Sequence, residues 1–496
     1  MSQRRLIPMR SALDDPALFG EILPGKSWAL WRILLIASQG ETLSAEERLV
    51  FLELTGRERE PDAPVDEFWG VFGRRAGKTR AFAILAVYYA CLIDYADVRA
   101  PGERLKVVLL AATTKQATKA FTYIRGIIEG VPLFANMMDG EPTADTIRLT
   151  NGVDIEIRPA NYRTIRGETL VCLLCDEVAY WHTADTAANP DSEILGAARP
   201  ALATTGGPLY GFSSPYSKRG ELWNTFKRDF GPDGDPSVLV AKGASRTMNP
   251  TLSEKVVDRA YKADPAAAAA EYGGEFRNDI EAFITLEAVQ ACIPTGVRER
   301  PPVAGIRYRA FVDVSGGGSD SHVLAIAHHD GEVAVLDAVR ELQGSPDAVT
   351  VEFAGLLKTF GVTTVVGDNY GAAWVRDRFA AHGVTYQPSE KNKSDIYREF
   401  LPILNSEQCR LLDVPKLEAQ LVALERRTTR GTGRDIIDHP QMKGAHDDVA
   451  NAVAGAITVA KIEERRKIIF TRENIEQLKQ LTQSKRPPHQ MFARRR

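Results

Sequence analysis

The chain has 496 residues, of which 44% are hydrophobic and 26% are charged, and its formal net charge is −3. This composition excludes long disordered stretches and lacks the overall basic character that marks many nucleic-acid-binding proteins. The longest uncharged apolar run, residues 81–93, is too short to span a bilayer, and five cysteines are too few for a disulfide scaffold. We therefore expect a soluble intracellular protein of two or three domains, without membrane contact.

The first part of the chain alternates between helical and extended patterns. Residues 25–56 are expected to be helical because apolar residues recur there at helical spacing. From residue 67 onward, unbroken apolar runs are separated by helical stretches, which predicts a mostly parallel sheet with helices on both faces. The expected strands span residues 67–72, 106–112, 170–175 and 209–212, and a helix follows the first of them to about residue 93.

Prolines and glycines punctuate residues 280–305 and indicate a domain boundary. Beyond it, the pattern predicts three strands, a helix and a further strand, at residues 308–314, 322–328, 332–338, 346–360 and 363–367. We therefore expect two α/β domains. The expected segments are a helical subdomain at 1–66, a first domain at 67–280, a linker at 281–305, a second domain at 306–462 and a tail at 463–496.

The end of the chain is basic. From Lys461 to Arg496 there are 11 Lys and Arg against 4 Asp and Glu, a net charge of +7. Such a tail could contact phosphate or an acidic partner, and a solvated terminus is an equally good interpretation.

A glycine-containing turn follows the first expected strand and opens a helix. In such a turn, backbone N–H groups and the helix N-terminus bind phosphate, a lysine reaches the β- and γ-phosphate oxygens, and a Ser or Thr hydroxyl ligates Mg²⁺. The position six before Lys78 is Phe72 rather than the usual glycine. The expected ATP-binding residues of the loop are Gly73, Arg74, Arg75, Ala76, Gly77, Lys78 and Thr79.

Two carboxylates, Asp176 and Glu177, end the apolar strand about 100 residues after this loop. Beside bound ATP, Asp176 would hold the Mg²⁺ ion and Glu177 would polarise the attacking water. Alternatively, the acidic pair merely caps the next helix. Cys172 and Cys175 lie in the same strand and are expected to pack in the core rather than bind zinc. The loop and the carboxylates together predict ATP hydrolysis.

In the second domain, aspartates lie where strands end and where a helix starts. Asp313 and Asp368 each end an expected strand, and Asp447 and Asp448 open a helix. Carboxylate oxygens bind hard divalent ions, and two metals about 4 Å apart can stabilise both the attacking and the leaving oxygen of a phosphodiester. Singly, each aspartate is better explained as a turn former or a helix cap. The ordered set predicts an RNase H-like nuclease with two Mg²⁺ or Mn²⁺ ions.

Taken together, these segments resemble the large subunit of tailed-bacteriophage terminases, over residues 25–460. The arginine-containing phosphate loop is typical of that family, residues 112–117 are similar to the motif on its next strand, and residues 211–215 are similar to its coupling motif. The resemblance implies an α/β protein with an N-terminal P-loop ATPase domain of the RecA/ASCE type, followed by a C-terminal RNase H-like nuclease domain.

The resemblance also implies roles for single residues. Arg74 would contact the nucleotide, and Arg166 would be offered to the ATP of a neighbouring subunit in a ring. The coupling residues would be Ser213, Ser214 and Pro215. The metal-binding residues would be Thr79 and Asp176 in the ATPase site and, in the nuclease site, Asp313, Asp368 and one of Asp447 and Asp448, with Asp320 as an accessory acid. The implied catalytic set is Glu177, Arg74, Arg166, Asp313, Asp368 and Asp448.

As a function, the resemblance implies ATP-driven movement of double-stranded viral DNA into a procapsid and metal-dependent cutting of concatemeric DNA when packaging starts and ends. The implied partners are the portal ring, the small terminase subunit and further copies of the chain in a pentameric ring. The expected location is the host bacterial cytoplasm, transiently on the procapsid portal, and not the mature virion.

Three alternatives stay open on the sequence. One is a helicase-type ATPase with an RNase H-like DNA-binding or resolvase domain. Another is a transposase or resolvase that uses ATP as a switch. The third is a capsid-associated scaffold in which both sites have decayed.

Overall fold

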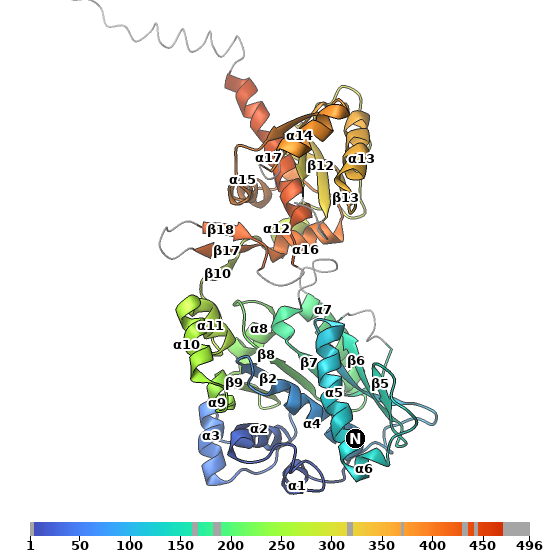
Figure 1. Cartoon of the computed structure of the whole chain (residues 1–496), viewed down its shortest axis with the longest axis vertical. Helices are drawn as coiled ribbons and strands as arrows, with labels where there is room; N and C mark the ends of the chain where they lie inside the picture. The colour runs from blue at the N-terminus through green and yellow to red at the C-terminus, as the bar shows by residue number, and fades with distance from the viewer. Residues whose placement is uncertain are drawn as a thin grey trace, which may run out of the picture. The chain divides into compact units, whose positions relative to one another are not determined.

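The computed structural model describes residues 4–160, 167–181, 190–314, 321–368, 372–428, 435–440 and 445–469. The chain forms two compact units, one mainly of residues 1–282 and the other mainly of residues 283–496 (Figure 1). Within the described ranges, no helix is both long enough and apolar enough to cross a membrane.

The first unit is built on a sheet in which the described residues form seven strands. All neighbouring strands are parallel except β5 and β6, which confirms the predicted mostly parallel α/β architecture. In spatial order the strands are β5 (Thr146–Arg148), β6 (Val153–Pro159), β4 (Leu105–Ala111), β7 (Leu170–Asp176), β8 (Leu209–Ser213), β2 (Glu67–Phe72) and β9 (Val238–Gly243).

Both faces of this sheet are buried. Successive side chains of a strand point to opposite faces, so one strand contributes to both clusters. Phe68 and Phe72 of β2 pack in the cluster that includes α4 (Lys78–Cys91) and α5 (Thr114–Gly130). Trp69 and Val71 of the same strand pack in the opposite cluster, with α7 (Pro190–Ala203) and α8 (Gly220–Asp229). Burial on both faces explains why the strands read as unbroken apolar runs.

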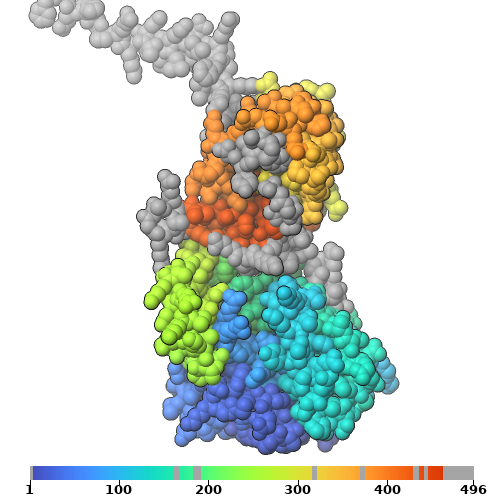
Figure 2. Space-filling view, in the orientation of Figure 1, coloured from blue at the N-terminus to red at the C-terminus, as the bar shows by residue number. Residues whose placement is uncertain are grey.

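Residues 25–56, predicted to be helical, contain two separate α-helices after a short 3-10 helix. Gly40 takes a left-handed φ of 66° after α2 (Ala29–Ser38), which ends that helix. A capping box between Ser44 and Glu47 then starts α3 (Ala45–Thr55). Trp31 is fully buried in the core shared with α4, and the space-filling view shows the blue N-terminal residues continuous with the cyan residues of α5 (Figure 2). The described residues 4–66 therefore share the core of the first unit.

The remaining elements of the first unit are short. In chain order they are β1 (Arg4–Arg5), α1 (Met9–Asp14), η1 (Lys26–Trp28), β3 (Ile93–Asp94), α6 (Pro132–Ala135), η3 (Val178–Tyr180), α9 (Ser245–Met248), α10 (Glu254–Ala263), α11 (Pro265–Glu271) and β10 (Ile280–Ala282).

Arg57 joins the end of α3 to the segment before β9. Its guanidinium is buried and donates hydrogen bonds of 2.9–3.1 Å to the carbonyls of Asp229, Gly231, Asp235 and Val238. Arg57→Met would remove all four hydrogen bonds from a buried site, so we expect the free energy of unfolding to fall by about 3–5 kcal/mol. Urea denaturation monitors this, with the exposed Arg59→Met as control; equal stability of the two variants would contradict the role of Arg57.

The second unit contains a mixed sheet, in which the described residues form six strands. The strands β11, β12 and β13 form an antiparallel meander, and β14 and β15 extend it in parallel from β11. This is the strand order of an RNase H-like domain, as predicted. In spatial order the strands are β15 (Thr385–Pro388), β14 (Thr364–Gly367), β11 (Tyr308–Asp313), β12 (His322–Asp330), β13 (Val333–Leu342) and β16 (Cys409–Arg410).

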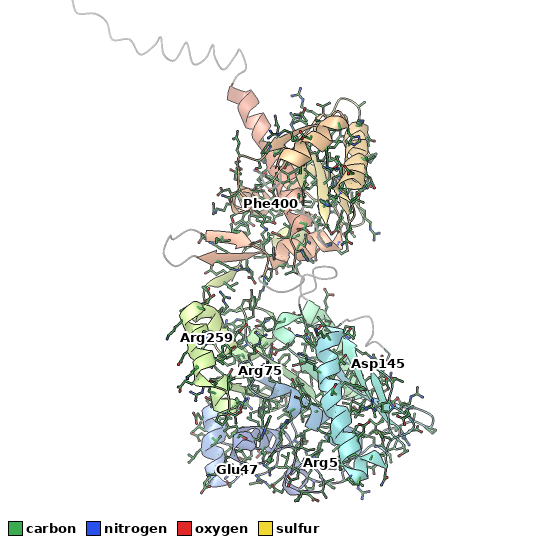
Figure 3. The ribbon with its side chains drawn as sticks, in the orientation of Figure 1. Arg5, Glu47, Arg75, Asp145, Arg259 and Phe400 are labelled. Carbon is green, nitrogen blue, oxygen red and sulfur yellow. The ribbon has the colours of Figure 1, made fainter. Side chains whose placement is uncertain are left out.

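Helices cover both faces of this sheet. Phe311 and Val323 pack with α15 and α17, and Phe400 of α15, labelled in Figure 3, lies fully buried in that cluster. The opposite cluster includes α13 and α14. Beside the sheet, β17 and β18 form an antiparallel pair. The bounds are α13 (Pro346–Thr359), α14 (Ala372–Ala381), α15 (Lys393–Asn405), α16 (Pro415–Ala423), β17 (Glu425–Thr428), β18 (Asp435–Asp438) and α17 (Asp448–Ile469).

The segment 281–305, expected to be a linker, differs from that expectation. It contains the helix α12 (Leu286–Ala291), and Ile284, Val289 and Cys292 are buried in the core with α15 and α17. Prolines and glycines punctuate this segment, but its apolar residues still contribute to the second unit.

Candidate active sites

The phosphate loop connects β2 to α4 and is held from two sides. Gly77 has a φ of 101°, and a Cβ atom at this position would lie 2.7 Å from the ring of Trp28. The indole Nε1 of Trp31 donates a 2.6 Å hydrogen bond to the carbonyl of Ala76. Arg75, labelled in Figure 3, also has a left-handed φ, of 67°. Residues of the N-terminal helices therefore fix the backbone of the loop. Only glycine fits at position 77, because of its positive φ and the close Trp28 ring.

On the other side, the loop contacts the segment after β9. The Oγ of Ser245 donates 2.7 Å to the carbonyl of Arg74, and the Nδ2 of Asn249 donates 3.0 Å to the carbonyl of Arg75. The Arg74 guanidinium is exposed and lies 3.1 Å from the carboxylate of Glu271 at the end of α11. Protein donors thus hold the carbonyls of the loop, which fixes the orientation of its backbone.

Lys78, Glu177 and Ser214 meet where β2, β7 and β8 end. The Lys78 ammonium is almost fully buried and lies 3.1 Å from Glu177 Oε1 and 2.9 Å from Ser214 Oγ. The other carboxylate oxygen of Glu177 accepts hydrogen bonds from the Ser214 N–H at 2.9 Å and the Ser213 hydroxyl at 3.1 Å. Because β8 lies between β2 and β7, the three motifs predicted for binding, hydrolysis and coupling form one connected network.

Glu177 holds its position with a strained backbone. Its φ of 52° and ψ of 46° are left-handed, which is uncommon for glutamate, and its N–H donates to the carbonyl of Phe212 at 2.9 Å. Strain that a rigid fold maintains is a feature of functional sites. Asp176, directly before it, is buried at the end of β7. Burial, and then the neighbouring Glu177 carboxylate, raise the pKa of Asp176 to about 7 against the opposing charge of Lys78.

Asp176 therefore destabilises the fold when it is ionised. The folded protein retains a proton that the unfolded chain loses near pH 4, so stability falls as the pH rises from about 4 to 7. Asp176→Asn is expected to raise the free energy of unfolding at pH 8, by about 4 kcal/mol at most, and to change it far less at pH 5. Urea denaturation at both pH values measures this, with the exposed Asp62→Asn as control. A loss of stability at pH 8 would contradict the expectation.

The other predicted residues of this site are placed less closely. Thr79 lies in the first turn of α4 and is partly exposed, and Pro215 is buried directly after Ser214. Arg166, expected to serve a neighbouring subunit, lies outside the described residues, as does Asp320 of the second domain. Cys172 and Cys175 are fully buried in β7, as expected of core residues.

In the second unit, Asp313 and Asp368 come together at one edge of the sheet. Asp313 ends β11 and Asp368 follows β14, and these two strands are parallel neighbours with Val312 opposite Gly367. Asn451 of α17 is fully buried and bridges them, because its Nδ2 donates 2.7 Å to Asp313 Oδ2 and 3.0 Å to Asp368 Oδ2. The fold thus assembles two of the predicted acids around one amide group.

The Asp313–Asp368 pair fits a hard cation. Burial, and then the Asp368 carboxylate, raise the pKa of Asp313 well above its usual range, and burial also raises the pKa of Asp368. The Oδ1 atom of Asn451 is buried and has no hydrogen-bond partner among the described residues. A divalent ion takes oxygen ligands of this type and offsets the repulsion of the two carboxylates. The three side chains therefore have the donor set of a Mg²⁺ or Mn²⁺ site.

Asp447 and Asp448 differ in their surroundings. Asp447 is buried, and its carboxylate contacts Lys393, His439 and Tyr397 at 2.8–3.0 Å. Burial alone would raise the pKa of Asp447, but the hydrogen bond from His439 and the charge of Lys393 outweigh it and lower the pKa. Asp448 opens α17 and is partly exposed, and its charge adds to the rise in the pKa of Asp313.

Similarity to known proteins is found among solved structures. No protein-family model and no curated protein matches the sequence. Among solved structures, the HK97 bacteriophage large terminase is similar at 16% identity and a TM-score of 0.35, over 80% of this chain and 91% of that one. The large terminase of a thermophilic bacteriophage, in complex with ADP, is similar at 13% identity and a TM-score of 0.35, over 79% of this chain and 94% of that one.

The nuclease of the large terminase from the thermophilic phage G20c, with bound magnesium, is similar at 15% identity and a TM-score of 0.31. It covers 35% of this chain and 95% of its own. The chain is similar in structure to phage large terminases. At these identities and TM-scores, the similarity assigns no activity to this chain. We therefore infer its function from its own side chains.

Several residues of the two sites are absent from the sequence-based predictions. In the first unit these are the loop supports Trp28, Trp31, Ser245 and Asn249. In the second unit they are Lys393, Tyr397, His439 and Asn451. Asn451 follows Asp447 by four residues, so helical spacing alone could have placed it on the same face. The others come from distant segments, and no local pattern marks them.

Proposed function

We propose that this chain is the large subunit of a phage DNA-packaging terminase, in which the first unit hydrolyses ATP to move double-stranded DNA and the second unit cuts it. The observation that carries the proposal is the occurrence on one chain of two assembled sites. One is the Lys78–Glu177–Ser214 network at the phosphate loop, and the other is the Asp313–Asp368–Asn451 group.

In the first unit, ATP would exchange the partners of Lys78. Its ammonium pairs with Glu177 in the structure, and the phosphates of ATP offer it a competing anion. Released from Lys78, Glu177 can orient and polarise the attacking water, while Thr79 and Asp176 would hold the Mg²⁺ that neutralises charge on the phosphates. Ser214 contacts both Lys78 and Glu177, so an exchange of partners changes the hydrogen bonds at the end of β8. This is the proposed link from hydrolysis to movement.

In the second unit, Asp313 and Asp368, with one of the acids at the start of α17, would hold the divalent metal. The bound metal supplies positive charge to the scissile phosphate and a water of lowered pKa. Asp313 and Asp368 fix the position of the metal, and Asn451 fixes the two carboxylates through a single amide group. The number of metals is part of the proposal, with two ions as in the sequence-based prediction.

The partners belong to the proposal as well. Packaging calls for double-stranded DNA, a portal ring, a small terminase subunit and further copies of the chain in a ring, with Arg166 offered across the subunit interface. The protein would work in the host cytoplasm and would bind the portal of the procapsid only transiently. Contacts with the DNA backbone that break readily in salt would suffice for grip and release.

The rival function is a helicase-type ATPase with an RNase H-like DNA-binding domain. The test follows ATP hydrolysis, plasmid cleavage in Mg²⁺ or Mn²⁺, and strand displacement from a forked duplex, all with the full chain. The proposal expects DNA-dependent ATP hydrolysis and metal-dependent cleavage without strand displacement. Robust unwinding would favour the helicase, and absence of both hydrolysis and cleavage would overturn the proposal.

A further inference from the structure

A second cluster of charged side chains lies near the Asp313–Asp368 pair, close enough for the charges of Lys393 and Asp447 to act on the pKa of Asp368. It consists of Lys393 and Tyr397 of α15, Asp438 and His439 at the end of β18, and Asp447 before α17. The Lys393 ammonium lies 2.5 Å from Asp438 and 3.0 Å from Asp447. His439 lies 3.0 Å from both of these carboxylates. The proposed ATP and metal chemistry assigns no role to Lys393, Tyr397, Asp438 or His439.

Lys393 stands at a position that helices disfavour for a cation. It is the first residue of α15, where the helix dipole is positive, and it follows the N-cap Asn392. Two carboxylates offset this cost. Tyr397 lies one turn later on the same helix face, and its hydroxyl donates 2.8 Å to Asp447 Oδ2 while Lys393 donates to Oδ1. The helix thus holds both oxygens of Asp447.

The two groups of acids therefore differ in what neutralises them. Asp447 accepts hydrogen bonds from the Lys393 ammonium and the Tyr397 hydroxyl and contacts the His439 ring, and a metal bound to it would have to displace or share these partners. Among the described residues, the hydrogen-bond donor to the Asp313 and Asp368 carboxylates is the neutral amide of Asn451. Asp313 and Asp368 therefore need the charge of a divalent ion. At Asp447, the protein itself supplies a positive charge through Lys393.

We propose that Lys393 is a fixed cation of the nuclease centre, which contacts the scissile phosphate beside the Asp313–Asp368 metal site, and that Asp447 is its positioning residue rather than a metal ligand. This inference rests on the proposed nuclease function. Asp448 then remains as the acid of α17 that can complete the metal site. About 30% of the Lys393 side chain is exposed, so a DNA phosphate can approach this side chain from solvent.

The proposed contact assists one step. The oxygen of a water molecule bonds to phosphorus, and the P–O bond to the leaving strand breaks. The leaving oxygen takes the electron pair and a proton from solvent, and the water loses a proton to solvent. Negative charge grows on the phosphate oxygens as this happens, and a preorganised ammonium lowers its energy.

Calorimetric titration of the full chain with Mn²⁺ separates the two roles of the acids. We expect Asp313→Asn to weaken Mn²⁺ binding at least 10-fold, whereas Asp447→Asn changes it less than about 3-fold and Lys393→Met leaves it equal or tighter. Loss of Mn²⁺ affinity in Asp447→Asn as large as in Asp313→Asn would overturn the inference while leaving the nuclease assignment intact. Unchanged Mn²⁺ affinity in Asp313→Asn would instead overturn the metal site itself.

DNA binding and cleavage test the contact of Lys393. In EDTA, Lys393→Met should reduce the salt dependence of duplex binding by about 0.9 in log K against log salt, as for one lost phosphate contact. At saturating Mn²⁺, cleavage should fall about 100-fold, with partial recovery in Lys393→Arg and unchanged ATP hydrolysis.

The matched control is Lys391→Met, because Lys391 lies two residues away, is 33% exposed and pairs with Glu399 at 2.5 Å. It should change neither binding nor cleavage. Lys393→Met leaves the carboxylates of Asp438 and Asp447 without their lysine partner, and the double variant Lys393→Met/Asp438→Asn removes one of these two charges. If cleavage stays low in the double variant, the loss reflects the missing contact rather than a folding defect. Cleavage by a folded Lys393→Met protein at the rate of the Lys391→Met control would overturn the inference.

Discussion

Glu177→Gln is expected to reduce ATP turnover by about 100- to 10,000-fold while leaving nucleotide binding intact. Glutamine retains the shape of the side chain but cannot accept a proton from the attacking water. The change also removes the ion pair between Lys78 and Glu177, so ATP should bind at least as tightly as to the wild type. Phosphate release gives the turnover, and titration with a fluorescent ATP analogue gives the affinity.

The control for this variant is Glu275→Gln in the same unit. Glu275 is an exposed partner of Lys242, at 2.6 Å, and its replacement should affect neither turnover nor affinity. Turnover of Glu177→Gln at the wild-type rate would remove Glu177 from the mechanism. A loss of ATP binding together with turnover would show that the residue builds the pocket instead of acting on water.

Asp313→Asn is expected to abolish metal-dependent DNA cleavage, by about 1,000-fold or more if a metal is lost from the site, without changing ATP hydrolysis. Because burial and Asp368 raise the pKa of Asp313, its ionised form is unfavourable in the folded state at neutral pH. The variant should therefore also have a higher melting temperature than the wild type in EDTA. Plasmid nicking and thermal unfolding measure the two effects.

Asp330→Asn serves as the matched control, since Asp330 is an exposed aspartate at the end of β12 in the same sheet. It should leave both cleavage and melting temperature unchanged. Retained cleavage in Asp313→Asn would refute the site. A lower melting temperature would show that the Asp313 carboxylate stabilises the fold. That result would contradict the expectation that two buried like charges destabilise it.

Much of the fold could be predicted because local patterns of apolar residues mark its strands. The strands β2, β4 and β7 of the first sheet and β11 and β14 of the second are apolar runs buried on both faces. Within each sheet, parallel pairing brings the residues at the ends of these strands to the same edge. Lys78, Glu177, Asp313 and Asp368 follow from such strand ends. The strand β6 is absent from the sequence-based prediction, because Asp154, Glu156 and Arg158 alternate with its apolar residues and leave no unbroken apolar run. In the structure these three side chains form ion pairs with other segments.

The surroundings of the acids could not be predicted in the same way. Lys393 has the local appearance of a solvated surface charge at a helix start, and only tertiary packing brings it to Asp438 and Asp447. For the same reason the sequence left Asp447 and Asp448 equivalent. They differ through side chains contributed by α15 and the end of β18, which lie 8 to 54 positions from Asp447 along the chain.

The tryptophans beneath the phosphate loop give the protein a built-in optical reporter. Trp28 contacts Gly77 and stacks with Arg80 at 4.9 Å, and Trp31 donates its indole N–H to the loop carbonyl of Ala76. These are two of the six tryptophans, and indole emission depends on hydrogen bonding and nearby charge. A nucleotide bound at the loop should alter both, so the fluorescence of the unlabelled protein should report occupancy of the phosphate loop.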